Sequence, residues 1–346
     1  MPLLFDDTVA ANSSLTSSTR FITPMTIPAK LVSVIIPSYN YSEYISDAIN
    51  SILEQTYPHW EVIVVDDGSK DNTAGVVASF SARDSRIKYH YQQNQGLSAA
   101  RNTGIALAKG DYLQFLDADD HISKHKLEIQ VGLLEQDPNA ALVYADTYIY
   151  THSDVPNASR DYRRFNLTMP AITGQGTPLV LHMAIDNIFL VGSPLFKRSV
   201  ALAAGPFDQT LFSLEDWHFW YRVALLNNRF LYDNREGTEF YVRTHGKNMS
   251  GNRYRMWKYK IQARISLIGM VKCMLREGEA VDVKAVLARH QALLYEEQAR
   301  FELLFGRMSI GLAHTLHCAL RGNKPVRIWY DSAYWIKERL LGRNKK

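Results

Sequence analysis

The sequence predicts an α/β fold with a mostly parallel central sheet and helices on both of its faces. Strand and helix patterns alternate between residues 31 and 150. The segments Val32–Ile36 and Val62–Val65 are nearly all β-branched, as expected of strands that are buried on both faces. Acidic residues follow two of the strands, at the sheet edge where folds of this class bind ligands.

The expected elements are strand 31–37, helix 42–55, strand 61–65, helix 71–82, strand 86–91, helix 97–108 and strand 111–116. The first helix has the clearest pattern, because Ile45, Ala48, Ile49, Ile52 and Leu53 recur at helical spacing. Ser42 is placed to be its N-cap. A further helix is expected to 185, with Thr177 as N-cap and Pro178 at its first position, and another over 215–226.

Three carboxylates, Asp117, Asp119 and Asp120, follow the strand 111–116 almost without interruption. Their mutual repulsion would raise one or more pKa values unless a metal or a basic group lay nearby. Hard oxygen ligands suit Mg²⁺ or Mn²⁺ better than Zn²⁺, and such an ion commonly takes further ligands from a substrate phosphate. The alternative is a solvated acidic turn in front of a helix that begins near Ser123.

A second acidic segment, Asp66–Ser69, follows the strand 61–65 and has the composition of a turn. A carboxylate there can also accept a hydrogen bond from a nucleobase imide, and Tyr39 offers an aromatic face after the first strand. No GxGxxG sequence follows the first strand and no GxxxxGK[ST] sequence occurs, so dinucleotide and P-loop sites lose their main support.

Several segments together resemble, in order and spacing, the successive motifs of family 2 glycosyltransferases with the GT-A fold. They are Val34–Asn40, Val64–Ser69, Gly96–Gly104, Phe115–Asp120, Gly205–Asp208 and Leu214–Arg222. The resemblance covers roughly residues 31–250 and implies a GT-A fold whose nucleotide-binding half is Rossmann-like. It also implies an inverting enzyme that moves a hexose or N-acetylhexosamine from a nucleotide sugar, a UDP-sugar above all, to a glycan or lipid-linked acceptor in surface polysaccharide synthesis.

The resemblance also implies roles for individual residues. Pro37 and Tyr39 would line the base, Asp67 would meet the uracil, Arg101 would lie near the donor, Asp117 would contact the ribose or sugar, Asp119 would bind Mn²⁺ or Mg²⁺ as part of a DXD motif, and Asp216 would be the catalytic base. His245 would lie near the metal or diphosphate, although a lone histidine is more often structural. Asp216 can also be read as the acidic first turn of its helix. His218 stands where relatives often carry Asp, which leaves the acceptor-side hydrogen bonding open.

Two other readings stay open at this point. One is a non-catalytic nucleotide-sugar-binding or scaffold protein of the same fold, against which the intact Asp119 and Asp216 argue. The other is a sugar-nucleotide pyrophosphorylase, which normally has a glycine-rich loop where this chain has Pro37–Asn40.

The expected organisation is a flexible N-terminal tail (1–30), a GT-A domain (31–250) and a basic helical region (251–346). The domain divides into a nucleotide-sugar half (31–120) and an acceptor half (121–250), and residues 153–176 suggest a loop over the acceptor side or disorder. Residues 252–346 carry 19 Lys and Arg against 8 Asp and Glu, whereas residues 1–251 carry 20 against 27. Helices are expected near 252–277, 281–307, 309–320 and 326–341.

The last of these helices has Trp329, Ala333, Ile336 and Leu340 on one stripe among basic residues. This composition is typical of a helix lying on an anionic membrane surface, so residues 321–346 are a candidate membrane contact. The alternative is that the stripe packs on the catalytic domain. No recognisable nucleic-acid-binding motif occurs, and no nucleic-acid partner is expected.

The two cysteines are too few for a disulfide framework and suit a reducing compartment. No secretory signal and no apolar run of membrane-spanning length is evident. We therefore expect a cytoplasmic protein, either free or attached peripherally to the cytoplasmic face of the inner membrane.

Overall fold

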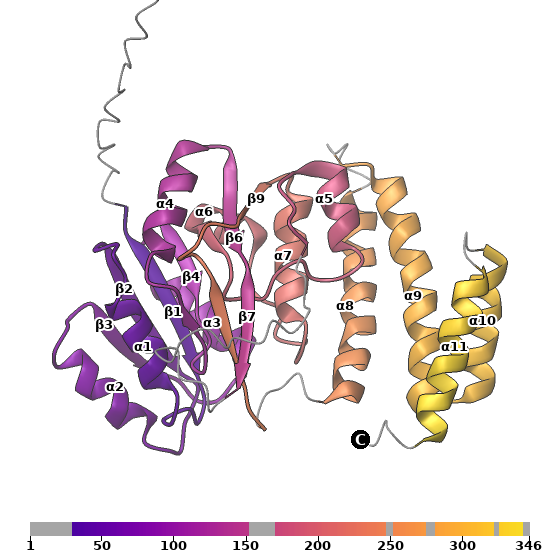
Figure 1. The fold of residues 1–346 in the computed structure, drawn as a ribbon, viewed down its shortest axis with the longest axis horizontal. Helices are drawn as coiled ribbons and strands as arrows, with labels where there is room; N and C mark the ends of the chain where they lie inside the picture. The colour runs from indigo at the N-terminus through magenta and orange to yellow at the C-terminus, as the bar shows by residue number, and fades with distance from the viewer. Residues whose placement is uncertain (1–29, 152–169, 247–251, 275–280, 322–324, 342–346) are drawn as a thin grey trace, which may run out of the picture.

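The computed structural model describes residues 30–151, 170–246, 252–274, 281–321 and 325–341. The expected tail before residue 30 and most of the expected loop 153–176 lie outside these ranges. Figure 1 shows an α/β body joined to a row of C-terminal helices.

Seven strands form the main sheet in the order β3-β2-β1-β4-β8-β6-β9. Their bounds are β1 Val32–Ser38, β2 Trp60–Asp66, β3 Ile87–Tyr91, β4 Tyr112–Phe115, β6 Ala140–Ala145, β8 Leu195–Lys197 and β9 Arg229–Asp233. Neighbouring strands are parallel except around β8, which runs antiparallel to both β4 and β6. The predicted mostly parallel sheet is confirmed.

A second, three-stranded sheet has the order β5-β10-β7, with β5 at His121–Ile122, β7 at Thr147–Thr151 and β10 at Phe240–Thr244. Strand β10 is parallel to β7 and antiparallel to β5. Because β5 directly follows the three carboxylates after β4, this pairing brings the end of β10 close to the acidic turn.

Helices cover both faces of the main sheet (Figure 1). They are α1 Ile45–Leu53, α2 Thr73–Ser81, α3 Leu97–Leu107, α4 Lys126–Gln136, α5 Gly176–Met183, α6 Arg198–Ala204 and α7 Glu215–Leu225. Alternate residues of β1 enter two separate cores: Ile35 packs with residues of α3 and α7, and Val34 and Ile36 pack with residues of α1 and α4. Gly104 lets α3 approach this strand closely, since a Cβ atom there would overlap Ile35.

Three of the expected helix starts are wrong. Helix α1 begins at Ile45 with Tyr44 as N-cap, because Ser42 lies in the preceding turn, where both its N–H (2.9 Å) and its side chain bond to Asp71. Helix α4 begins at Lys126, because the Ser123 N–H pairs with Glu239 O at the start of β10 (3.0 Å). Helix α5 begins at Gly176 with Gln175 as N-cap, and the hydroxyl of Thr177 accepts a hydrogen bond from Asp282 N (2.8 Å).

One residue assigned to the buried stripe of the first helix is also misplaced. Ile45, Ala48, Ile49 and Ile52 are fully buried, as expected, but Leu53 is 39% exposed at the end of α1. The stripe is therefore narrower than the sequence pattern indicates.

The four expected C-terminal helices are present as α8 Arg253–Met274, α9 Val283–Phe305, α10 Met308–Arg321 and α11 Pro325–Leu340. In Figure 1, α8 stands beside α7, then comes α9, and α10 and α11 are outermost. Buried side chains of α8 and α9, such as Leu267 and Val286, belong to the same core as those of α5 and α7. None of the helices within the described ranges is long and apolar enough to cross a bilayer.

Candidate active site

The first part of the site lies where β1 and β2 end. Pro37 is buried within β1, and Tyr39 follows the strand with 43% of its surface exposed. Asn40 adopts a left-handed conformation (φ 61°) that a non-glycine residue rarely takes, and its side-chain oxygen accepts a hydrogen bond from Lys70 N (2.7 Å). This bond ties together the turns that follow the two strands.

Asp67 lies in the same place, directly after β2, and is buried. Its Oδ1 atom accepts hydrogen bonds from Gln92 Nε2 (2.7 Å) and Gln95 N (2.9 Å), and its Oδ2 atom accepts one from Gly96 N (2.8 Å). The carboxylate thus fixes the loop that leads into α3. Its expected contact with a uracil stays a prediction. The Asp67 oxygens would make it through lone pairs that these three hydrogen bonds do not use.

The acidic turn after β4 is brought against β10. The Nε2 atom of His245, the residue that follows β10, lies 2.9 Å from Asp119 Oδ2, and its ring stacks on Tyr44 with centroids 4.8 Å apart. Burial first, and then repulsion from Asp117, raises the pKa of Asp119, while His245 opposes the rise. The structure therefore brings together the two residues that the sequence proposed as metal ligands.

Asp120 bonds to the backbone of β10. Its Oδ1 atom accepts a hydrogen bond from Arg243 N (2.9 Å), and Arg243 also donates to Asp119 O (3.0 Å) and to Asp47 (2.5 Å). Burial and the neighbouring carboxylates raise the pKa of Asp120 well above its ordinary value. Sequence reasoning missed Arg243, because an arginine inside a short strand carries no signal of a buried role.

The residues at this turn fit a divalent cation. A carboxylate oxygen of Asp119 and the imidazole of His245 are donors that Mn²⁺ accepts readily, and burial together with the neighbouring carboxylates raises the pKa values of Asp119 and Asp120. Among the described residues, no three His, Cys, Asp or Glu side chains come together as a complete metal site. A cation here would therefore need ligands from a bound phosphate or from water.

Arg101 joins the acidic turn to α7. Its side chain is almost fully buried, Nη2 donates to Asp117 Oδ1 (2.9 Å), and Nη1 donates to Glu215 Oε1 (2.6 Å). Glu215 belongs to the predicted motif segment Leu214–Arg222 and to the acidic first turn of its helix, but its pairing with Arg101 across 114 positions cannot be read from spacing. This one guanidinium links the two halves of the site.

Asp216 is the second residue of α7, next to Glu215. It follows Leu214, which holds a left-handed conformation (φ 61°) of the kind that clusters at functional sites. Its Oδ2 atom accepts a hydrogen bond from Asn187 Nδ2 (2.9 Å), and its Oδ1 atom accepts one from Trp217 N (2.8 Å). Burial first, and then repulsion from Glu215, raises the pKa of Asp216 to about 7, which is the range that suits a general base at neutral pH.

His218 does not face this carboxylate. It is buried, and its Nε2 atom lies 3.0 Å from Ser266 Oγ on α8. Burial lowers the pKa of His218 to about 4, so the ring is neutral at pH 7. The residue that departs from the family motif connects α7 to the C-terminal helices.

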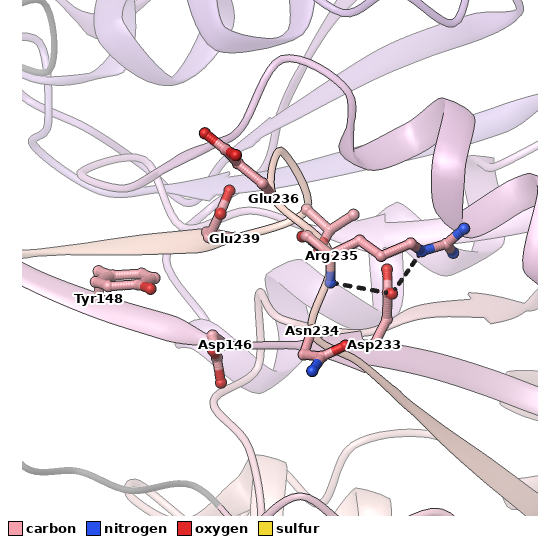
Figure 2. Close-up of a pocket in the computed structure, with 8 residues that line it drawn as sticks. Asp146, Tyr148, Asp233, Asn234, Arg235, Glu236 and Glu239 are labelled. Carbon is pink, nitrogen blue, oxygen red and sulfur yellow. Dashed lines mark hydrogen bonds and ion pairs between the residues drawn. The ribbon is translucent and has the colours of Figure 1, made fainter.

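A separate acidic cavity of about 350 Å³ lies at the other end of the small sheet. Figure 2 shows Asp233 held by Arg235, with the carboxylate of Glu236 pointing away from both. Asp146 and Glu239 precede β7 and β10, whereas His245 follows β10, so the cavity and the acidic turn are at opposite ends of these strands. None of the predicted site residues lines it.

The chain is similar in sequence to known glycosyltransferases. Residues 33–190 match the family described as "Glycosyl transferase family 2". A Bacillus subtilis glycosyltransferase named for teichuronic acid biosynthesis is 46% identical over 105 residues, which are 30% of this chain and 42% of the relative. The match thus spans about two fifths of that relative's length.

Solved structures agree on the fold. Staphylococcus aureus TarS (residues 1–349) in complex with UDP-GlcNAc has a TM-score of 0.60 at 18% identity, covering 90% of this chain and 92% of that one. The mannosyltransferase PcManGT of Pyrobaculum calidifontis, in complex with GDP-Man and Mn²⁺, has a TM-score of 0.59 at 19% identity, covering 90% and 86%. The fold is GT-A, with a helical C-terminal region.

Proposed function

Starting from the chain's membership of glycosyl transferase family 2 through residues 33–190, we propose that it is an inverting, metal-dependent glycosyltransferase that uses a nucleotide sugar. The donor we propose is a UDP-sugar, and the acceptor a glycan or lipid-linked glycan of a surface polysaccharide. The teichuronic-acid relative and the UDP-GlcNAc complex of a structural neighbour support this choice.

The observation that carries the proposal is the link through Arg101. Asp117 on the donor side and Glu215 beside Asp216 share this buried guanidinium, at 2.9 and 2.6 Å. A donor held at the acidic turn and a base at the start of α7 would thus keep one fixed separation. Fixed placement of the reacting groups is a large part of catalysis.

Each residue then has a stated task. The exposed ring of Tyr39 offers a face on which a base can stack, and Asp117 would contact the ribose or the sugar. Asp119 and His245 would hold the cation, which would offset negative charge on the departing diphosphate. Asp216 would accept the proton of the acceptor hydroxyl, a contribution of about 10² to 10⁴ in rate.

We also propose that the outermost helices α10 and α11 contact an anionic membrane surface, because they expose several leucines. Helix α11 packs on α9 and α10 with polar groups among its contacts: Arg339 donates to Gly306 O (2.9 Å), and Ser332 lies 3.2 Å from Thr315. Leu312 and Leu316 on α10 and Leu340 on α11 are 38%, 48% and 76% exposed. Leu340 and Ala333, two residues of the predicted stripe, are thus exposed instead of packed on the catalytic domain.

A donor screen tests the proposed activity. The purified full chain is incubated with UDP-GlcNAc, UDP-glucose, UDP-galactose and GDP-mannose, with Mn²⁺, Mg²⁺ or chelator, and nucleotide release is measured. We expect metal-dependent release from at least one UDP-sugar, with water as the acceptor in place of the glycan. No release from any donor under any condition would favour the non-catalytic binding protein.

A further inference from the structure

We propose that the C-terminal helices α8 and α9 form part of the catalytic machinery, because their buried Arg264–Glu297 pair and the 183–187 turn position Asp216 through Asn187. The inference rests on the proposed role of Asp216 as the base. Arg264, Glu297 and Asn187 are positioning residues in this account, since none of them touches the reacting atoms.

The first link is an ion pair between the two helices. Arg264 of α8 is fully buried, and it donates from Nε and Nη2 to the two carboxylate oxygens of Glu297 on α9, at 2.5 and 2.6 Å. Such a two-pronged pair fixes direction as well as distance. Apolar side chains of similar volume often stabilise a protein as well as a buried ion pair does, so stability alone does not explain this pair. We infer that the pair holds the neighbouring turn in place.

The second link runs from this pair to the end of α5. The Nη1 atom of Arg264 donates to Ala184 O (2.7 Å), and the indole of Trp217 donates to the preceding carbonyl, Met183 O (2.7 Å). Two residues farther along, Asp186 pairs with Lys260 of α8 (2.7 Å). The turn after α5 is therefore held by α7 on one side and by α8 on the other.

The third link reaches the proposed base. Asn187 closes the same turn and donates from Nδ2 to Asp216 Oδ2 (2.9 Å). The turn determines the position of this amide, and the bond from Arg264 to Ala184 O holds the turn. A hydrogen bond to the ionised carboxylate favours the charged form and fixes its orientation.

Helix α7 is also held directly by the two C-terminal helices. The guanidinium of Arg264 lies over the ring of Trp217 (5.0 Å), and His290 of α9 contacts both Arg264 (3.0 Å) and the Tyr221 hydroxyl (2.7 Å). Because Arg264 can only donate, His290 accepts at Nδ1 and donates from Nε2 to Tyr221. Together with the His218–Ser266 contact, these bonds fix the first two turns of α7, where Asp216 lies.

The groups that face Asp216 come from several elements. They are Glu215 on α7, Arg101 on α3, Asp117 after β4 and the neutral amide of Asn187. Of these, Asn187 is held by α8 through the 183–187 turn, and Glu215 lies on α7 beside Asp216. Loosening the C-terminal helices should therefore change the Asn187 contribution most directly, because Glu215 moves together with Asp216.

The test uses the full chain and removes the pair as a unit. Arg264→Met with Glu297→Leu deletes both charges and leaves no buried charge unpaired, and Asn187→Ala removes only the last link. The matched control, Thr315→Ala with Ser332→Ala, removes a buried polar pair between α10 and α11, the two outermost helices. The readouts are UDP affinity with Mn²⁺, kcat for UDP release from the donor found in the screen, and the pH dependence of kcat.

We expect both test variants to bind UDP within about twofold of the unmodified chain and to lose about 10-fold or more in kcat, since small misplacements of reacting groups are costly. The acidic limb of the kcat profile should move to higher pH, because the carboxylate loses a donor. The control should change neither quantity. An unchanged kcat and pH limb in both test variants, or a loss in kcat that comes only with weaker UDP binding, would overturn the inference.

A measurement that needs no substrate covers two further cases, an unmodified chain without turnover and a double variant that does not fold. The titration of Asp216 is followed by NMR in chains carrying ¹³C-labelled aspartate, with Asp216→Asn to assign the signal. If the unmodified chain releases no UDP from any donor, the proposed function fails, and this titration still decides the positioning claim. If the double variant does not fold, Asn187→Ala decides it: a raised Asp216 pKa supports the inference, and an unchanged one overturns it.

Discussion

His245 and Asp119 lie 126 positions apart in the chain, yet their Nε2 and Oδ2 atoms are 2.9 Å apart. The pairing of β10 with β5 explains this, because Tyr241 is opposite His121, two residues beyond Asp119. The backbone register thus sets the distance between the two proposed metal ligands. Stacking on Tyr44 fixes the plane of the His245 ring.

Replacement of Asp119 by Asn should weaken metal-dependent UDP binding by about 10- to 100-fold, because one ligand of the cation loses its charge. The same change should stabilise the metal-free protein at pH 7, since the fold disfavours the charged form of this carboxyl. Calorimetry of UDP with and without Mn²⁺, and thermal unfolding in chelator, are the two measurements. Unaltered metal-dependent binding would remove Asp119 from the metal site.

Replacement of Arg101 by Met should destabilise the protein by about 3–5 kcal/mol, because Glu215 would remain buried without its partner. The control is Arg229→Met, which breaks the more exposed pair with Asp137 and should have a much smaller effect on stability. Urea unfolding of the three proteins gives both values. Equal effects of the two substitutions would contradict the central place of Arg101.

The raised pKa of Asp216 also predicts a pH dependence of stability. Its pKa is about 7 in the folded protein against an ordinary value of 3.8, so between these values the folded state keeps a proton that the unfolded state has lost. The contribution of this carboxyl to stability therefore falls as pH rises from about 4 to about 7. Asp216→Asn should gain stability relative to the unmodified chain between pH 5 and pH 8, as measured by urea unfolding in chelator. A difference that stays constant with pH would mean an unperturbed carboxyl.

The exposed leucines of the outer helices give a fourth prediction. Replacing Leu312, Leu316 and Leu340 by Ser should reduce sedimentation of the full chain with anionic liposomes at low salt, since apolar contact and basic charge act together at such a surface. The control replaces Leu53, Leu107 and Leu202, which are also exposed but lie on α1, α3 and the end of α6. If neither set changes sedimentation, or if the unmodified chain does not sediment, the membrane proposal is wrong.

Much of the fold could be predicted because local and global signals agree in the first 116 residues. The β-branched strands β1 and β2 are buried throughout, and the residues after them meet at one sheet edge. Helix starts were less predictable, since Ser42 has the chemistry of an N-cap but its N–H bonds to Asp71 from another turn. Such competition between local and distant partners leaves no mark in the sequence.

The site was predictable only in part, for a related reason. Asp119 and Asp216 belong to short motifs, but Asn187, Arg243 and Arg264 act through partners that are 26 to 196 positions away. A charged residue such as Arg264 within a basic helical region is more often solvated than buried, so the sequence carries no sign of its buried position. The structure instead puts this side chain in the interior, between α5, α7 and α9.

The most direct test of the central claim compares donor binding with turnover in Asp216→Asn. We predict that UDP affinity with Mn²⁺ stays within about twofold of the unmodified chain, while UDP release in the presence of acceptor or water falls by about 10² to 10⁴, because Asn cannot accept a proton. Turnover of the unmodified chain should rise with pH through about 7 and then level off, as Asp216 loses its proton. Retained turnover in the folded Asp216→Asn protein would contradict the account and move the base to another residue.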